Sequence, residues 1–125
     1  MTHYTVKVQF DADALAARCA DVFSAAVGVL AEDVMADCEI YVPYDTGQLC
    51  HSVSRGDVTE DLGCIRCDIV WSAPHASAVY YGDERGVRYH TGHHAHAQAR
   101  WFEGAAASCR ERWEENLRAR ILDEL

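Results

Sequence analysis

The residues of this sequence that most directly suggest catalytic chemistry form one tripeptide, Asp45-Thr46-Gly47. Asp-Thr-Gly surrounds the catalytic carboxylate of aspartic proteases, where two carboxylates share one proton, and a short chain would supply half of a dimeric site. In those enzymes the tripeptide follows an apolar strand, and a second apolar strand ends in a glycine turn. Here it follows Pro43-Tyr44 at the end of a helical pattern, and the sequence has no second element of that kind. A dimeric aspartic protease is thus an alternative that depends on three residues.

A second candidate is a zinc site. Cys64-Ile-Arg-Cys67 has the C-x-x-C spacing of zinc ligands, and four histidines follow later in the chain: His90, His93, His94 and His96. However, Cys64 and Cys67 lie in a strand-like pattern, where side chains three apart point to opposite faces and cannot share an ion. A small zinc-binding module remains an alternative, and we expect no metal and no cofactor.

The sequence contains no other complete catalytic motif. Cys50, His51 and Ser52 are adjacent, but neighbours in sequence seldom face each other, and no strand-turn-helix nucleophile elbow surrounds them. The phosphate-binding and dinucleotide-binding glycine patterns are both missing. The six cysteines are expected to remain thiols, since no export signal is visible.

Composition narrows the class of protein further. A chain of 125 residues that is 50% hydrophobic and 25% charged is expected to form one globular domain, spanning residues 1–125. Its formal net charge of −9 argues against a protein that grips nucleic acid through phosphate contacts. No run of apolar residues approaches the length of a membrane span, so we expect no membrane partner.

Periodicity predicts an α+β fold, in which a long N-terminal helix and a C-terminal helix pack on a small antiparallel sheet. Residues 4–10 alternate as an edge strand, with Tyr4, Val6, Val8 and Phe10 on one face. After a cap at Asp11 or Asp13, one long helix is expected to reach about Tyr41, with an apolar stripe from Leu15 to Cys38 and a bend near Gly28.

Pro43 must end that helix, because its ring clashes with the preceding turn and it has no N–H to donate. The segment from Pro43 to Ser52 therefore predicts a corner, in which Asp45 caps a short helix, with Gln48 in the reciprocal position of a capping box. Leu49 is expected to anchor this corner in the core.

The rest of the chain predicts a hairpin, a loop and a closing helix. Residues 53–60 and 64–72 form the hairpin, around a turn at 60–63, and Pro74 ends its second strand. Residues 76–81 are expected to form a short helix closed by Gly82. Residues 83–96 are polar and rich in Gly and His, and they predict a mobile arm. A helix is expected from about Ala97 to Leu122, with an ion pair between Glu114 and Arg118.

Four separated blocks resemble a known family. The segment Tyr41-Val-Pro-Tyr-Asp-Thr-Gly-Gln-Leu-Cys-His-Ser52 resembles the P-x-D-T-G-x-L-x-x-S segment of small phage neck and tail-completion proteins, often described as minor capsid proteins. Ile69-Val-Trp-Ser-Ala-Pro-His-Ala76, Tyr80-Tyr-Gly82 and Ala99-Arg-Trp-Phe-Glu-Gly-Ala105 follow in the same order. His75 stands where we expect Tyr, and the segment between Gly82 and Ala97 is unusually rich in His. The structural motif residues implied by the resemblance are Pro43, Asp45, Thr46, Gly47, Leu49, Ser52, Trp71, Pro74, Tyr80, Tyr81, Gly82, Trp101, Phe102 and Glu103.

The resemblance implies a virion structural protein at the head–tail junction, present in the host cytoplasm before assembly, and not an enzyme. Such proteins form a homo-oligomeric ring between the head connector or head-completion protein and the tail-tube or tail-terminator protein. DNA would pass through the ring without specific binding, which agrees with the acidic balance of the chain. The arm would supply subunit contacts through Arg85, Arg88, Tyr89, His90, His93 and His94.

Overall fold

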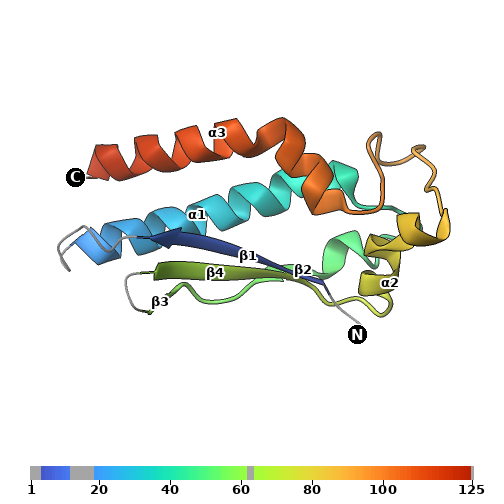
Figure 1. Cartoon of the computed structure of the whole chain (residues 1–125), viewed down its shortest axis with the longest axis horizontal. Helices are drawn as coiled ribbons and strands as arrows, with labels where there is room; N and C mark the ends of the chain where they lie inside the picture. The colour runs from blue at the N-terminus through green and yellow to red at the C-terminus, as the bar shows by residue number, and fades with distance from the viewer. Residues whose placement is uncertain (1–3, 12–18, 62–63, 125) are drawn as a thin grey trace.

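The computed structural model describes residues 4–11, 19–61 and 64–124 of the chain (Figure 1). The predicted cap at Asp13, the apolar position Leu15 and the hairpin glycine Gly63 lie outside the described residues, and so does the side chain of Phe10.

A four-stranded antiparallel sheet is built around β4 (Cys64–Trp71). One edge of β4 pairs with β1 (Tyr4–Asp11), and the other pairs with both β2 (Val53–Arg55) and β3 (Thr59–Asp61). Buried and partly exposed residues alternate along β4, as the sequence predicts. The predicted edge strand and hairpin are therefore confirmed, except that the first arm of the hairpin is interrupted between β2 and β3.

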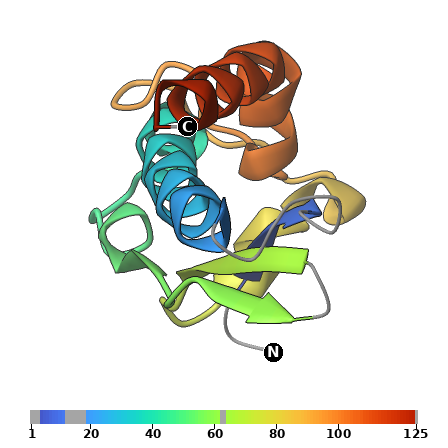
Figure 2. The same ribbon diagram turned by 90° about the vertical axis from the view of Figure 1, so that its left-hand side faces the viewer.

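Two long helices complete the fold and confirm the predicted α+β class. Helix α1 (Ala20–Cys38) crosses one face of the sheet, and α3 (Trp101–Glu124) lies on α1 on the side away from the sheet (Figures 1 and 2). The core between these layers contains Val27 and Val34 of α1, Ile65 and Ile69 of β4, and Trp113 of α3. No helix in the described parts of the chain is both long and apolar enough to cross a membrane.

The carboxyl end of α1 follows the predicted signal, and Gly28 within the helix has a packing role. Beyond Cys38 the chain continues as the 3-10 turn η2 (Glu39–Tyr41) and becomes extended at Val42, directly before Pro43. Gly28 is buried, and a Cβ atom there would lie 3.3 Å from Cγ2 of Val58. Glycine at this position therefore lets the helix approach the chain between β2 and β3 closely.

Three local expectations are wrong. Helix α3 begins at Trp101 rather than near Ala97, because Arg100 has a left-handed backbone (φ 52°). Gly82 does not end the short helix α2 (Ala76–Tyr80); it begins the 3-10 turn η4 (Gly82–Arg85), and the positive φ of 74° belongs to Gly86. Arg118 pairs with Glu115 at 3.6 Å rather than with Glu114.

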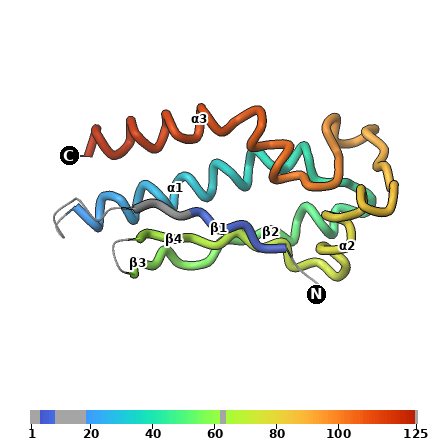
Figure 3. The backbone as a smooth tube through the Cα atoms, viewed as in Figure 1, coloured from blue at the N-terminus to red at the C-terminus, as the bar shows by residue number. Residues whose placement is uncertain are grey.

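Segments far apart in the sequence meet at one end of the molecule. The tube in Figure 3 shows the corner after α1, helix α2 and the loop before α3 gathered at the end remote from the C-terminus. The four blocks of the family resemblance lie in these segments and in the adjoining ends of β4 and α3. The candidate functional surface therefore lies at this end.

Candidate assembly surface

Three aromatic residues from three of the four blocks form the base of this end. Trp71 of β4, Tyr80 of α2 and Trp101 of α3 are all fully buried. The ring centroids of Trp71 and Trp101 are 5.6 Å apart, and those of Tyr80 and Trp101 are 4.7 Å apart, both in edge-to-face arrangements. Tyr4 of β1 stacks on Tyr80 at 3.6 Å. The expected core aromatics thus pack into one cluster that joins the sheet to α2 and α3.

Burial has a clear electrostatic consequence in this cluster. Desolvation raises the pKa of Tyr80 far above its usual range, and the neighbouring Tyr4 hydroxyl raises it further. Desolvation also raises the pKa of Tyr4. Both phenols therefore stay neutral, and the cluster has the environment of a packed core rather than of an acid–base site.

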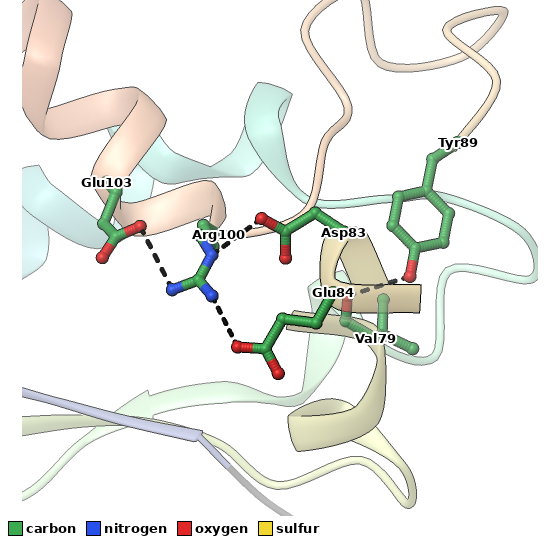
Figure 4. Close-up of polar contacts among 6 residues, drawn as sticks. All are labelled: Val79, Asp83, Glu84, Tyr89, Arg100 and Glu103. Carbon is green, nitrogen blue, oxygen red and sulfur yellow. Dashed lines mark hydrogen bonds and ion pairs between the residues drawn. The ribbon is translucent and has the colours of Figure 1, made fainter. Parts of the chain in front are cut away.

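Arg100 connects the cluster to the surface (Figure 4). Its Nε donates to Oδ2 of Asp83 at 2.8 Å and its Nη2 to Oε2 of Glu84 at 2.9 Å, while Nη1 lies 3.8 Å from Oε2 of Glu103. The guanidinium also lies 5.0 Å from the ring centroid of Tyr81. One side chain thus ties η4 to the first turn of α3.

The backbone around Arg100 reinforces this connection. Its N–H donates to the carbonyl of Tyr80 at 2.8 Å, and its own carbonyl accepts from the N–H of Gly104 at 3.0 Å, which begins the hydrogen bonding of α3. A Cβ atom on Gly104 would lie 2.6 Å from Oε1 of Gln98, so a larger residue at this position would displace the exposed Gln98 side chain of the incoming loop. The backbone of Arg100 is therefore held by hydrogen bonds to α2 on one side and to α3 on the other.

Tyr89 fixes the start of the predicted arm. Its hydroxyl donates to the carbonyl of Val79 at 2.9 Å, and burial raises its pKa (Figure 4). A Cβ atom on Gly82 would collide with this hydroxyl, which explains the glycine of the Tyr80-Tyr-Gly82 block. The loop is attached here to the carboxyl end of α2.

The histidines attach the same loop to the corner. His94 is buried, and its Nδ1 lies 2.8 Å from the carbonyl oxygen of Val42, to which a ring protonated on Nδ1 donates. His93 stacks on Tyr44 at 3.7 Å. The ring of His96 stacks on Tyr41 at 5.3 Å, and the backbone N–H of His96 donates to the carbonyl of Ile40.

This packing shows where the predicted arm lies in the isolated chain. Residues 86–98 lie against their own chain, because their histidines find aromatic and carbonyl partners on the corner. Within the predicted contact set, the side chains of Tyr89 and His94 are at least half-buried, whereas Arg85, Arg88, His90 and His93 are exposed. Two of these exposed side chains also contact their own chain, since His93 stacks on Tyr44 and Arg85 donates to the carbonyl of Ala78 at 3.1 Å.

The corner forms and contains a short 3-10 turn, but Asp45 does not cap it. Residues 44–49 are turns and bends, and the 3-10 turn η3 (Cys50–Ser52) begins at Cys50 without a side-chain cap. The side-chain acceptor is Thr46, whose Oγ1 accepts from the N–H of Gln48 at 3.3 Å, while Asp45 is exposed. Gly47 has a φ of 88°, which favours glycine. The capping role proposed for Asp45 is therefore wrong.

Several other residues of the family motif contribute to packing or to turns. Leu49 packs against the core and Ser52 Oγ donates to the carbonyl of Leu49 at 2.7 Å. Phe102 stacks on Trp113 at 6.1 Å. Pro43 is half-buried at the corner, and Pro74 is exposed in the turn after β4.

A comparison with protein-family models decides the family. The model described as "Minor capsid protein" matches residues 6–120. The chain belongs to this family of phage minor capsid proteins. It is therefore a structural component of a virion. No curated protein and no solved structure matched the chain.

The fold of the minor capsid protein does not support either alternative, the aspartic protease or the zinc-binding module. The Asp45 carboxylate is exposed in a turn, not at the end of an apolar strand, so it lacks the setting of a protease aspartate. Cys64 and Cys67 lie on opposite faces of β4, with Cys67 buried and its Sγ 3.5 Å from the carbonyl of Gly56. Across the described residues, no group of three or more His, Cys, Asp or Glu side chains could hold a metal.

Sequence reasoning missed the role of Arg100 and its acidic partners Asp83 and Glu84. Arg100 was visible within the last block, but sequence alone does not show that residues 16 and 17 positions earlier return to it. It also missed Asp37, whose Oδ2 accepts from Nε1 of Trp113 at 2.7 Å and from Arg112 at 2.8 Å, joining α1 to α3. Alternation and helical spacing carry no information about such long-range pairs.

Proposed function

We propose that this minor capsid protein acts at the head–tail junction of the phage, as a subunit of a homo-oligomeric ring. Its partners would be the connector or head-completion protein on one side and the tail-tube or tail-terminator protein on the other. The observation that carries the proposal is the convergence of the four neck-type blocks on one packed end, with Arg85, Arg88, His90 and His93 exposed on its outer loop. A packed end with exposed Arg and His side chains is suited to protein contacts, because interfaces combine a packed centre with a polar rim.

Charge supports the same position. The net charge of −9 disfavours phosphate contacts, and a passage for moving DNA benefits from a surface that does not hold it. We infer that DNA passes the ring without specific binding, and that the protein catalyses no reaction.

The experiment that tests the position is deletion of the gene followed by electron microscopy of the lysate. We expect complete heads and complete tails that remain separate, and joined particles when the protein is supplied in trans. Loss of heads would place the protein in the shell instead, and loss of tails would place it in tail assembly.

The loop is tested with Arg88→Glu, because Arg88 is exposed and the reversed charge leaves the internal contacts of Tyr89 and His94 intact. We expect fewer joined particles from this variant. Arg120→Glu, an exposed reversal on α3 far from the loop, is the control and should join normally.

Asp45 tests the enzymatic alternative. Because its carboxylate is exposed and caps no helix, Asp45→Asn should keep stability within about 0.5 kcal/mol and support normal joining. A peptidase activity of the wild type that disappears in this variant would establish the protease instead.

A further inference from the structure

An apolar groove of about 560 Å³ lies between β1, α1 and α3. Its floor is formed by Val8 of β1, Leu30 and Val34 of α1, and Trp113, Leu117 and Ile121 of α3. Leu122 at its edge is 66% exposed and extends the apolar lining of the groove toward solvent. The groove thus presents contiguous apolar surface to solvent.

The rim of this groove has the opposite charge to the molecule as a whole. Lys7, Arg110 and Arg118 line it, together with the carboxylate of Glu114. Arg118 is 3.6 Å from Glu115, which partly offsets its charge, so Lys7 and Arg110 contribute most of the positive charge. On a chain with a net charge of −9, such a basic rim favours an occupant with carboxylates beside apolar side chains.

A second recess, of about 390 Å³, lies between α1 and the corner and has the complementary character. Met35 and Val42 contribute apolar surface, and Glu32 and Glu39 are the charged residues that line it. Glu32 is also 3.9 Å from Arg55, which partly offsets its charge, whereas Glu39 has no ion pair within the described residues. We call the first surface the basic groove and the second the acidic recess.

The two surfaces lie on opposite sides of α1. Side chains four positions apart share a helix face, so Leu30 and Val34 point to one side, whereas Glu32 and Glu39, seven apart, point to the other. Figure 2 shows the same arrangement, with β1 on one side of α1 and the corner on the other. A contact between these surfaces in two copies is head-to-tail, and repeated contacts of that kind close into a ring when the rotation allows.

We propose that the basic groove of one copy binds the acidic recess of the next, and that this heterologous contact builds the ring. The inference deepens the proposed function by naming the subunit interface, and it adds to the contacts assigned to the loop. Charge complementarity selects the second copy as the occupant, and the apolar floors supply the area that becomes buried.

The experiment measures self-association by sedimentation velocity and native mass spectrometry over a range of concentrations. Arg110→Glu reverses the groove and Glu39→Lys reverses the recess, and each is expected to weaken association at least tenfold. The matched controls are Arg120→Glu, on α3 but outside the groove, and Glu60→Lys, exposed on β3. Both controls should associate like the wild type. Circular dichroism checks that each variant is folded, and Arg110→Gln replaces Arg110→Glu if it is not.

Mixing the two disrupted variants is the decisive step. The first keeps a native recess and the second keeps a native groove, so an equimolar mixture should form complexes although each variant alone does not. A symmetric contact of one surface with itself would not be restored in this way. Unchanged association in Arg110→Glu and Glu39→Lys, no complexes in the mixture, or a wild type that stays monomeric at every concentration would each overturn this interface. The particle phenotype of the gene deletion tests the junction role separately, so the two failures are distinguishable.

Discussion

Arg100 shows how much of the assembly surface depends on a single residue. It occupies a left-handed backbone position, begins the hydrogen bonding of α3 through its carbonyl, and pairs with carboxylates from η4 and α3. Its side chain is 32% exposed, so solvent weakens each ion pair. The combined effect of several contacts on one guanidinium nevertheless exceeds that of an isolated surface pair.

We therefore expect Arg100→Met to lower the free energy of unfolding, because it removes the ion pairs and leaves three carboxylates close together. Arg100→Lys keeps the positive charge but not the planar guanidinium. We therefore expect it to lower the free energy of unfolding less than Arg100→Met does. Urea unfolding measures the stability of both variants. Because salt screens ion pairs, the difference in free energy of unfolding between wild type and Arg100→Met should become smaller at high salt. Equal stability of wild type and Arg100→Met would show that these contacts contribute nothing.

Cys38 gives a prediction about pH. Burial raises the pKa of its thiol from the ordinary 9.0 to about 12, with smaller effects from the Asp37 carboxylate and from Cys109. Below pH 9.0 the thiol is protonated in folded and unfolded chains alike. Between pH 9.0 and 12 only the unfolded chain loses the proton, so stability falls with rising pH, by up to about 1.4 kcal/mol per pH unit.

Urea unfolding of wild type and Cys38→Ala at several pH values measures this effect. Other groups that titrate contribute equally to both chains, so the difference between the two curves isolates Cys38. We expect the wild type to lose stability more steeply above pH 9.0 than Cys38→Ala does. Parallel curves would contradict the burial of this thiol.

At the scale of elements, the loop before α3 and the corner after α1 stabilise each other through direct contacts. The corner contributes the carbonyl of Val42 and the rings of Tyr41 and Tyr44, and the loop contributes His94 and its neighbours. Neither segment has regular secondary structure that could fix its path alone. Their mutual contacts therefore position the exposed residues Arg88 and His90.

His94→Ala tests this coupling. The substitution removes the group 2.8 Å from the Val42 carbonyl and opens a buried position, so we expect a loss of about 1–3 kcal/mol. Trypsin should also cleave faster at Arg85 and Arg88, because the loop is released. The control His90→Ala changes an exposed ring of the same loop and should stay within about 0.5 kcal/mol of the wild type. Identical cleavage rates in the two variants would show that His94 does not hold the loop.

At the scale of the whole molecule, charge and shape act together. The net charge of −9 repels DNA at long range, yet the basic groove and acidic recess offer locally opposite charges on two sides of α1. Long-range repulsion and short-range complementarity are compatible, because salt screens charges farther apart than about 8 Å at physiological ionic strength.

For the same reason we expect no measurable binding to double-stranded DNA at physiological salt. Proteins bound through phosphate contacts lose affinity steeply as salt rises, because counterions are released. Fluorescence anisotropy of a labelled duplex should therefore stay flat over a titration with the protein, at low and at high salt. Binding that weakens linearly with the logarithm of salt concentration would reveal a basic DNA-contacting surface and contradict this prediction.

The sequence by itself determined the elements whose signals are local. Alternation in residues 4–10 and 64–71 produced the strands, because a strand exposes and buries its residues in turn. Helical spacing produced α1 and most of α3, and Pro43 marked the corner. Four blocks in order identified the family, which the match over residues 6–120 confirms.

Only the tertiary structure decided how those elements meet. The first turn of the predicted closing helix is absent, because the backbone at Arg100 is held by contacts with residues about 20 positions away. Three of the four histidines that resembled a metal site, His93, His94 and His96, pack instead on tyrosines of the corner, more than 40 positions earlier. Such contacts depend on where the sheet and helices place distant segments, and no periodicity along the chain encodes that placement.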